Sequence, residues 1–128
     1  MATLPWSEFA VAEPERSYTA MVSYLPVESF RTVPRFLWYV LQILNQLRHA
    51  TGLIGYTLQA RIFSKRFFTL SVWESEEALR RFVEQEPHRG IVRDLAGAMG
   101  KTEFRFFSVK GTELPLTFEK ELHRLTAQ

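Results

Sequence analysis

The order of its strand-like and helix-like segments is the feature that most constrains the fold of this chain. Strand-like segments alternate apolar and other residues with an approximate period of two, whereas helical segments repeat apolar residues every three or four positions. The order is strand, helix, strand, strand, broken helix, strand, over residues 18–25, 32–47, 55–63, 67–73, 75–99 and 102–109. This order predicts an α+β, ferredoxin-like βαββαβ fold, with both helices on one face of a four-stranded antiparallel sheet.

Breaking and capping residues support the two helices of this prediction. Pro34 fits the first turn of the first helix, and Gly52 ends it. Ser75 fits the N-cap of the second helix, which Pro87 interrupts. The buried stripe of the first helix is predicted to consist of Phe36, Val40, Leu44 and Leu47.

The length of 128 residues fits one domain, 1–128, with a single hydrophobic core. No repeat or linker divides the chain. We place the core at about residues 18–110, between an N-terminal arm (1–17) and a C-terminal tail (111–128). Phe118, Leu122 and Leu125 in the tail have the spacing of a short docked helix.

Composition excludes several classes of protein. The absence of Cys rules out disulfides, thiolate nucleophiles and iron–sulfur clusters. A net charge of +2, with Arg interleaved with Glu, argues against nucleic-acid binding. The longest apolar run, 36–41, is far shorter than the ~20 residues of a membrane span. Because the first residues lack the basic start and apolar stretch of a signal peptide, we expect a cytoplasmic protein that does not bind membranes.

The predicted strands carry apolar side chains on both faces. Val22 and Met21 point to opposite sides of one strand, as do Phe106 and Phe107 of another. In an antiparallel sheet with one face in water, apolar and polar residues alternate along each strand more regularly than they do here. Burying each such side chain in an interface would stabilise a dimer by about 1.5 to 3 kcal/mol. The loss of freedom on association costs ~4 to 15 kcal/mol. We therefore predict a homodimer closed through the sheet faces. The alternative is that the arm and the tail cover the second face within one chain.

One stretch resembles a known family. Residues 70–83, Leu-Ser-Val-Trp-Glu-Ser-Glu-Glu-Ala-Leu-Arg-Arg-Phe-Val, followed by Pro87-His88-Arg89, resemble the dimeric α+β barrel superfamily, in particular an uncharacterised branch of the antibiotic biosynthesis monooxygenase-like domains. The similarity covers about twenty residues, and the predicted order of elements agrees over 18–109. The resemblance implies a cavity between sheet and helices, used in some relatives for cofactor-free oxygenation of aromatic polyketides and in others for haem.

The resemblance argues against haem degradation. The haem-degrading relatives need a Trp on the helix after this strand and a His further along it. Aligned from Trp73, these positions hold Phe82 and Val92, neither of which can ligate iron. Haem binding in another mode stays open. No G-x-G-x-x-G or P-loop pattern is present, so no cofactor is predicted.

No metal site is predicted either. His49, His88 and His123 are dispersed along the chain. Glu119 and His123 have the i, i+4 spacing of two ligands on one helical face, but on a short tail helix a surface pair fits better.

His88 is the candidate catalytic residue. Near the start of a helix the local positive potential disfavours its charged form, which leaves a neutral ring able to relay a proton. A capping or packing role is the alternative. Arg66 and Arg89 are candidate anion clamps for a carboxylate or enolate substrate. Trp38, Trp73 and Phe82 are candidate substrate contacts, with Tyr24, Tyr39 and Tyr56 as further aromatic wall residues; a core role is the alternative.

Two hypotheses of function follow. The first is a small-molecule monooxygenase with an aromatic-lined cavity that oxygenates an aromatic substrate without a cofactor, with His88 as acid or base. The second is a non-catalytic dimer that binds a hydrophobic or aromatic small molecule or has a structural role.

Overall fold

The computed structural model describes residues 1–126 and contains one antiparallel sheet. Its main strands are β3 (Ser17–Pro26), β4 (Leu53–Arg61), β5 (Arg66–Trp73) and β6 (Glu103–Lys110), in the spatial order β4-β5-β3-β6. Two short strands of the arm, β1 (Ala2–Thr3) and β2 (Ser7–Glu8), extend the sheet by pairing with β4. The predicted ferredoxin-like α+β fold is confirmed, and the arm adds two strands to the predicted four.

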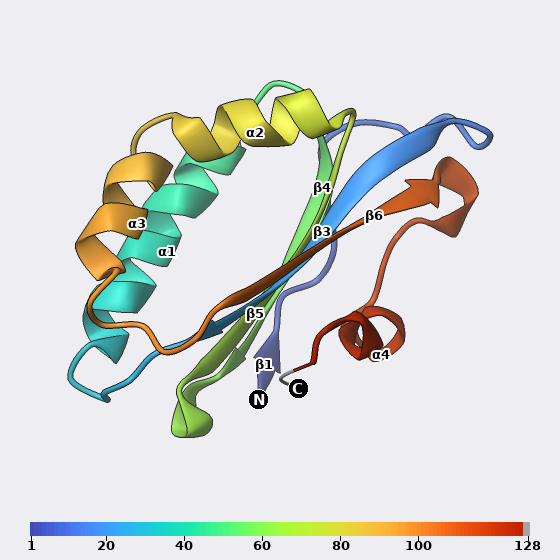
Figure 1. Cartoon of the computed structure of the whole chain (residues 1–128). Coiled ribbons are helices and arrows are strands. Elements are labelled where there is room, and N and C mark those ends of the chain that lie inside the picture. The colour runs from blue at the N-terminus through green and yellow to red at the C-terminus, as the bar shows by residue number, and fades with distance from the viewer. Residues whose placement is uncertain (127–128) are drawn as a thin grey trace.

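Three helices lie on one side of the sheet, as Figure 1 shows: α1 (Val33–Leu47), α2 (Glu76–Glu84) and α3 (His88–Leu95). Ser75 begins α2 as predicted, because its Oγ accepts a hydrogen bond of 3.1 Å from the backbone N–H of Ala78. Pro87 separates α2 from α3. Among residues 1–126, no helix has the length and apolar character needed to cross a membrane.

The hairpin between β4 and β5 differs from the prediction. The strand ends at Arg61, and a 3₁₀ turn, η1 (Ile62–Ser64), follows. Lys65 then takes a left-handed conformation with φ of 57°. The turn turns Phe63 out of the sheet, and its side chain is 94% exposed.

The space between sheet and helices is filled by two groups of apolar side chains. The group near the start of α2 consists of Leu47, Leu53, Tyr56, Trp73, Ala78, Leu79 and Phe82. The group near α3 consists of Val27, Val33, Phe36, Phe67, Ile91 and Leu95. Phe36 and Leu47 of the predicted α1 stripe are fully buried, and Val40 and Leu44 are half-buried.

The opposite face of the sheet is covered by the tail of the same chain. After β6 the tail forms η2 (Gly111–Glu113), α4 (Phe118–Glu121) and η3 (Leu122–Arg124), on the side away from α1 to α3 (Figure 1). Leu116, Phe118 and Leu125 pack against this face, and Trp6 and Ala12 of the arm pack beside them. The covered residues of the sheet are Tyr18, Ala20, Val22, Ile54, Phe68, Leu70, Val72 and Val109.

This covering is the alternative that the strand pattern left open. The tail docks with a shorter helix than its spacing suggests, because α4 spans only Phe118–Glu121. A homodimer through the sheet faces stays a prediction, and it would require the tail to move off its own sheet. Other apolar side chains remain exposed on the helix side of the sheet. Phe104 and Phe106 pair with Ser23 and Met21 on the helix side of β6 and are 45% and 61% exposed.

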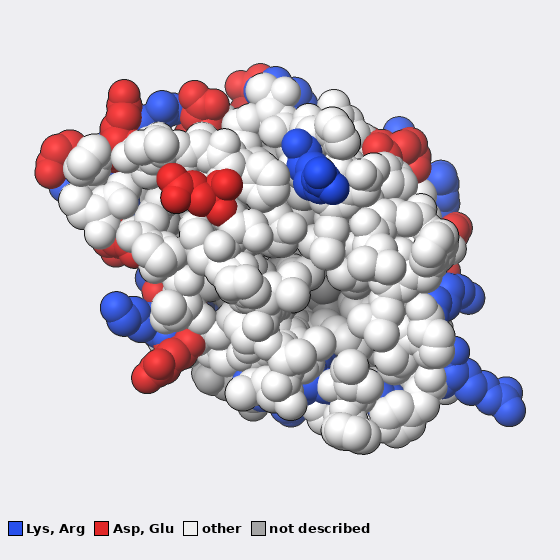
Figure 2. All heavy atoms as spheres, turned by 180° about the vertical axis from the view of Figure 1, so that it is seen from behind, with Lys and Arg blue, Asp and Glu red and all other residues white. Residues whose placement is uncertain are grey.

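Charged side chains are unevenly distributed over the surface. Figure 2 shows a broad face with an uncharged, hollowed centre and with most charges near its rim. One long stretch of the sequence is poor in charge: Arg48 is the only Lys, Arg, Asp or Glu in residues 36–60. Exposed apolar side chains on α1 include Trp38 and Leu41.

Candidate functional site

Three of the predicted site residues form a row of rings at the junction of α2 and α3. Trp73 comes from the end of β5, Phe82 from the last turns of α2, and His88 from the start of α3. The ring centroids of Trp73 and Phe82 are 5.2 Å apart, and those of Phe82 and His88 are 5.3 Å apart. Trp73 is buried, and its Nε1–H donates to Ser71 Oγ at 2.9 Å. The row therefore runs from the core outwards to a half-buried His88.

Gln46 of α1 holds this junction together. Its Nε2 donates to the carbonyl oxygen of Phe82 at 3.0 Å, and its Oε1 accepts from the backbone N–H of His88 at 3.0 Å. One side chain thus binds the end of α2 and the start of α3. The sequence analysis missed this role because Gln46 has no pattern in the chain that distinguishes it from other polar residues of α1.

The hydrogen bonding of His88 selects one tautomer. Its Nδ1 lies 3.2 Å from the carbonyl oxygen of Val83. A carbonyl oxygen only accepts, so Nδ1 carries the proton and Nε2 has the lone pair of a base. Burial lowers the pKa of His88 from its ordinary value of 6.5, while the Val83 carbonyl opposes this shift. The lowered pKa agrees with the neutral ring that the sequence analysis expected. Its main cause is burial and not the positive potential at the start of the helix.

The structure does not bring the other predicted residues to this row. Trp38 is 62% exposed on α1. Arg89 follows His88 in α3, but its side chain is exposed. Arg66 lies on the opposite face of the sheet, with its guanidinium carbon 5.9 Å from the centroid of the Tyr24 ring. A joint anion clamp of Arg66 and Arg89 is therefore not formed.

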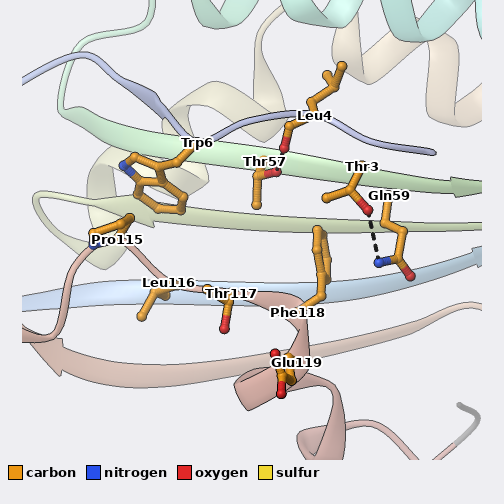
Figure 3. A pocket seen from close by; sticks show the side chains of 10 residues that line it. All are labelled: Thr3, Leu4, Trp6, Thr57, Gln59, Pro115, Leu116, Thr117, Phe118 and Glu119. Carbon is orange, nitrogen blue, oxygen red and sulfur yellow. Dashed lines mark hydrogen bonds between the residues drawn. The ribbon is translucent and has the colours of Figure 1, made fainter. Parts of the chain in front are cut away.

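The aromatic cavity expected between sheet and helices is occupied at this point by protein side chains. Leu79, Phe82 and Trp73 are buried and contact one another there. A hollow of about 320 Å³ lies on the other face of the sheet, between the arm, β4 and the tail. Its lining residues are drawn in Figure 3: Thr3, Leu4, Trp6, Thr57, Gln59, Pro115, Leu116, Thr117, Phe118 and Glu119.

The sequence analysis missed this hollow. Its polar residues Thr57 and Gln59 are two apart in a mostly apolar strand, so they point to the same face. That spacing was the available signal, but it does not reveal which segments cover the face. No cluster of three or more metal-ligating side chains occurs within residues 1–126. His123 Nδ1 lies 2.7 Å from the Lys120 carbonyl oxygen instead.

Several solved structures have a fold similar to that of this chain. SnoaB from Streptomyces nogalater, described as a cofactor-independent oxygenase, matches with a TM-score of 0.62 and 19% identity, over 79% of this chain and 100% of that one. A "putative antibiotic biosynthesis monooxygenase" from Nitrosomonas europaea matches with a TM-score of 0.62 and 12% identity, over 70% of this chain and 95% of that one. A conserved protein from Methanosarcina mazei matches with a TM-score of 0.63 and 16% identity, over 70% and 90% of the two chains.

No family model and no curated protein matches the sequence. The likeness is therefore one of three-dimensional structure, at identities too low to carry activity from one protein to another. It agrees with the local resemblance of residues 70–83. The chain has the ferredoxin-like α+β fold of the antibiotic biosynthesis monooxygenase-like proteins.

Proposed function

We propose that this chain is a monooxygenase-like protein that oxygenates a small aromatic substrate without a cofactor, with His88 as the base. The observation that carries the proposal is the state of His88. Burial lowers the pKa of its ring, which favours the neutral form, and its Nδ1–H donates to the Val83 carbonyl oxygen, so Nε2 has a lone pair for a proton. The fold shared with a cofactor-independent oxygenase supports the same chemistry.

The reaction needs a substrate with an acidic C–H bond. His88 Nε2 takes a proton from an activated methylene of a phenolic substrate, and the resulting carbanion reduces dioxygen directly. The overall reaction converts R₂CH₂ and O₂ into R₂C=O and H₂O. The substrate itself supplies the electrons, so no external reductant is required. The substrate would approach His88 from the rim of the α2–α3 junction, because Phe82 and Trp73 fill the interior behind it.

The second candidate is a non-catalytic protein that binds a hydrophobic small molecule. The filled space behind His88 favours it, because a cofactor-free oxygenase has to enclose its substrate away from water. Under this hypothesis His88 is a packing residue that joins α2 to α3.

Oxygen consumption separates the two candidates. We expect the protein to take up dioxygen with an anthrone-type phenolic substrate and to release the corresponding quinone. His88→Ala should lower the rate by a factor of about 10² to 10⁴, the usual contribution of a general base. His49→Ala is the matched control, since His49 is exposed and its ring also contacts a backbone carbonyl. Equal rates in the protein and in His88→Ala, with circular dichroism showing both folded, would favour the non-catalytic candidate.

A further inference from the structure

The turn between β4 and β5 carries the most exposed large apolar side chain of residues 1–126. Phe63 is 94% exposed there, and its neighbour Ile62 is 42% exposed. In Figure 1 this hairpin forms the lower end of the molecule. A single exposed apolar residue is ordinary on a protein surface, so the neighbours of Phe63 decide whether the turn is a contact surface.

The loop before α1 joins this turn to form one surface. Phe30 of that loop is 55% exposed, and the Nζ of Lys65 lies 4.6 Å from the centroid of its ring. The backbone N–H of Val27 donates to the carbonyl oxygen of Lys65 at 2.8 Å. These contacts hold three exposed apolar side chains at one end of the molecule. This group, the hairpin tip, consists of Phe30, Ile62 and Phe63.

The backbone of the turn is closed by its own hydrogen bonds. The N–H of Lys65 donates to the carbonyl oxygen of Ile62 at 3.0 Å, and Ser64 Oγ donates to the carbonyl oxygen of Arg61 at 3.1 Å. Lys65 has a φ of 57°, which residues with a Cβ rarely adopt. The apolar side chains are therefore presented without further ordering of the backbone, and this lowers the cost of docking.

Only basic charges surround the tip along this part of the chain. Residues 29–73 contain six Lys or Arg and no Asp or Glu; Glu28 is the nearest acid before them. Four of the basic residues belong to the turn or adjoin the tip: Arg31, Arg61, Lys65 and Arg66. None of the four forms an ion pair with another residue of 1–126. The tip thus combines exposed apolar side chains with positive charges that no acid neutralises.

Two of these charges are set back from the tip. Arg61 and Arg66 pair across the base of the hairpin, and both are half-buried. Their guanidinium carbons lie 4.7 Å from the Phe68 ring centroid and 5.9 Å from the Tyr24 ring centroid. A medium that took up the apolar tip would therefore meet positive charge behind it. Long basic side chains reach the polar side of an interface in this way.

We propose that the hairpin tip docks on an anionic lipid surface. Phe63, Ile62 and Phe30 enter the boundary between headgroups and acyl chains, and the basic side chains lie against the headgroups. Charge complementarity supports this partner, because anionic headgroups attract Lys and Arg near the surface. The projecting shape supports it too, since a protein partner would need a shaped pocket for Phe63 and a lipid boundary does not.

The sequence-based expectation of no membrane binding concerned spanning and leader segments. Contact through a surface turn requires neither of them. His88 and its neighbours take no part in the hairpin tip, so docking there is independent of the function proposed above.

The test is co-sedimentation of the full chain with vesicles. Vesicles of equal parts phosphatidylserine and phosphatidylcholine should bind the protein, and vesicles of phosphatidylcholine alone should bind it much more weakly. Raising the salt concentration from ~0.1 M to ~1 M should weaken the binding, because it shortens the screening length from ~10 Å to ~3 Å. Equal binding to the two kinds of vesicle would overturn the proposal.

A pair of variants tests the apolar contact. Phe63→Ser should weaken binding to the phosphatidylserine vesicles about tenfold, as the loss of one buried Phe side chain predicts. Phe106→Ser is the matched control and should bind like the parent chain. Phe106 is also exposed, at 61%, but it pairs with Met21, whereas Pro26 is the residue of β3 that pairs at the hairpin. Equal binding by the two variants would contradict the proposed contact.

A second pair tests the charge. Lys65→Gln should weaken binding about fivefold, the usual effect of one basic residue at an anionic surface. Lys110→Gln makes the same change in net charge at the opposite end of β3, where Lys110 pairs with Ser17, and it should bind like the parent chain. His88→Ala should also bind normally, which separates this proposal from the oxygenase.

Sedimentation velocity tests a second copy of the chain as the occupant of the tip. The lipid proposal expects Phe63→Ser to leave the association state of the protein unchanged. If neither kind of vesicle binds and the parent chain forms a dimer that Phe63→Ser abolishes, the tip contacts a second copy and the lipid proposal is wrong.

Discussion

At the scale of single residues, the packing of His88 and its proposed role as a base depend on the same contacts. His88 packs against Phe82 and closes the α2–α3 junction through its backbone bond to Gln46, as a structural residue does. Burial lowers the pKa of its ring, and the Val83 carbonyl oxygen orients the ring, as the proposed base requires. Packing and reactivity have the same cause here, because burial both fixes the ring and disfavours its charge.

The lowered pKa of His88 makes stability depend on pH. The folded state binds this proton more weakly than the unfolded chain, whose pKa is near 6.5, so stability rises with pH in this range. We expect the free energy of unfolding to fall as pH is lowered from 7 through 6.5 and towards the folded pKa. Urea unfolding at a series of pH values measures it.

His88→Gln isolates the contribution of this residue. The variant lacks the titrating group, so its free energy of unfolding should fall less than that of the parent chain between pH 7 and 5. Equal pH dependence in both proteins would show that His88 keeps its ordinary pKa when folded.

At the scale of elements, the tail is what turns the second face of the sheet into core. Leu116 comes from the segment before α4 and is 5% exposed against the sheet. We expect Leu116→Ala to lower the free energy of unfolding by about 2 to 5 kcal/mol, the usual range for removing a buried Leu side chain. Chemical denaturation measures the loss.

Val11→Ala serves as the control for this prediction. Val11 is also apolar but is 86% exposed in the arm, so its loss should change stability by less than about 0.5 kcal/mol. A Leu116 variant as stable as the Val11 variant would show that the tail does not pack on the sheet in solution.

At the scale of the whole molecule, the tail-side face of the sheet is covered by the tail of the same chain. The strands need a cover because their apolar residues on this face include Val22, Leu70 and Val72. We propose that the predicted sheet-to-sheet homodimer competes with the tail for this face. A chain that ends at Lys110 should then associate more tightly than the full chain, as sedimentation velocity at micromolar concentration measures.

Leu116→Ala is the intermediate case for association, because it weakens the tail without removing it. It should shift the equilibrium towards the dimer by less than the truncation does. If the truncated chain stays folded and monomeric, the sheet face is not a dimer interface.

The sequence alone was sufficient for much of the local structure and of the fold, but not for the 3₁₀ turn after Arg61 or the two strands of the arm. Pro34, Ser75 and Pro87 act within a few residues of their own positions, so the starts of the helices follow from nearby chemistry, whereas α1 ends at Leu47 and not at the predicted Gly52. The proximity of Trp73, Phe82 and His88 could also be predicted from the sequence, because all three lie in one continuous strand–helix–helix segment. The order of the segments then leaves few ways to arrange them in a sheet.

Only the tertiary structure decided what covers the sheet and where the hollow lies. Trp6, Gln59 and Phe118 are about fifty or more residues apart, and nothing local to any one of them indicates the other two. An apolar strand face has the same pattern whether it meets a tail, an arm or a second chain, because burial depends on removal from water and not on the identity of the cover. The partner of a face is therefore a property of the folded molecule, whereas the need for a partner is already present in the sequence.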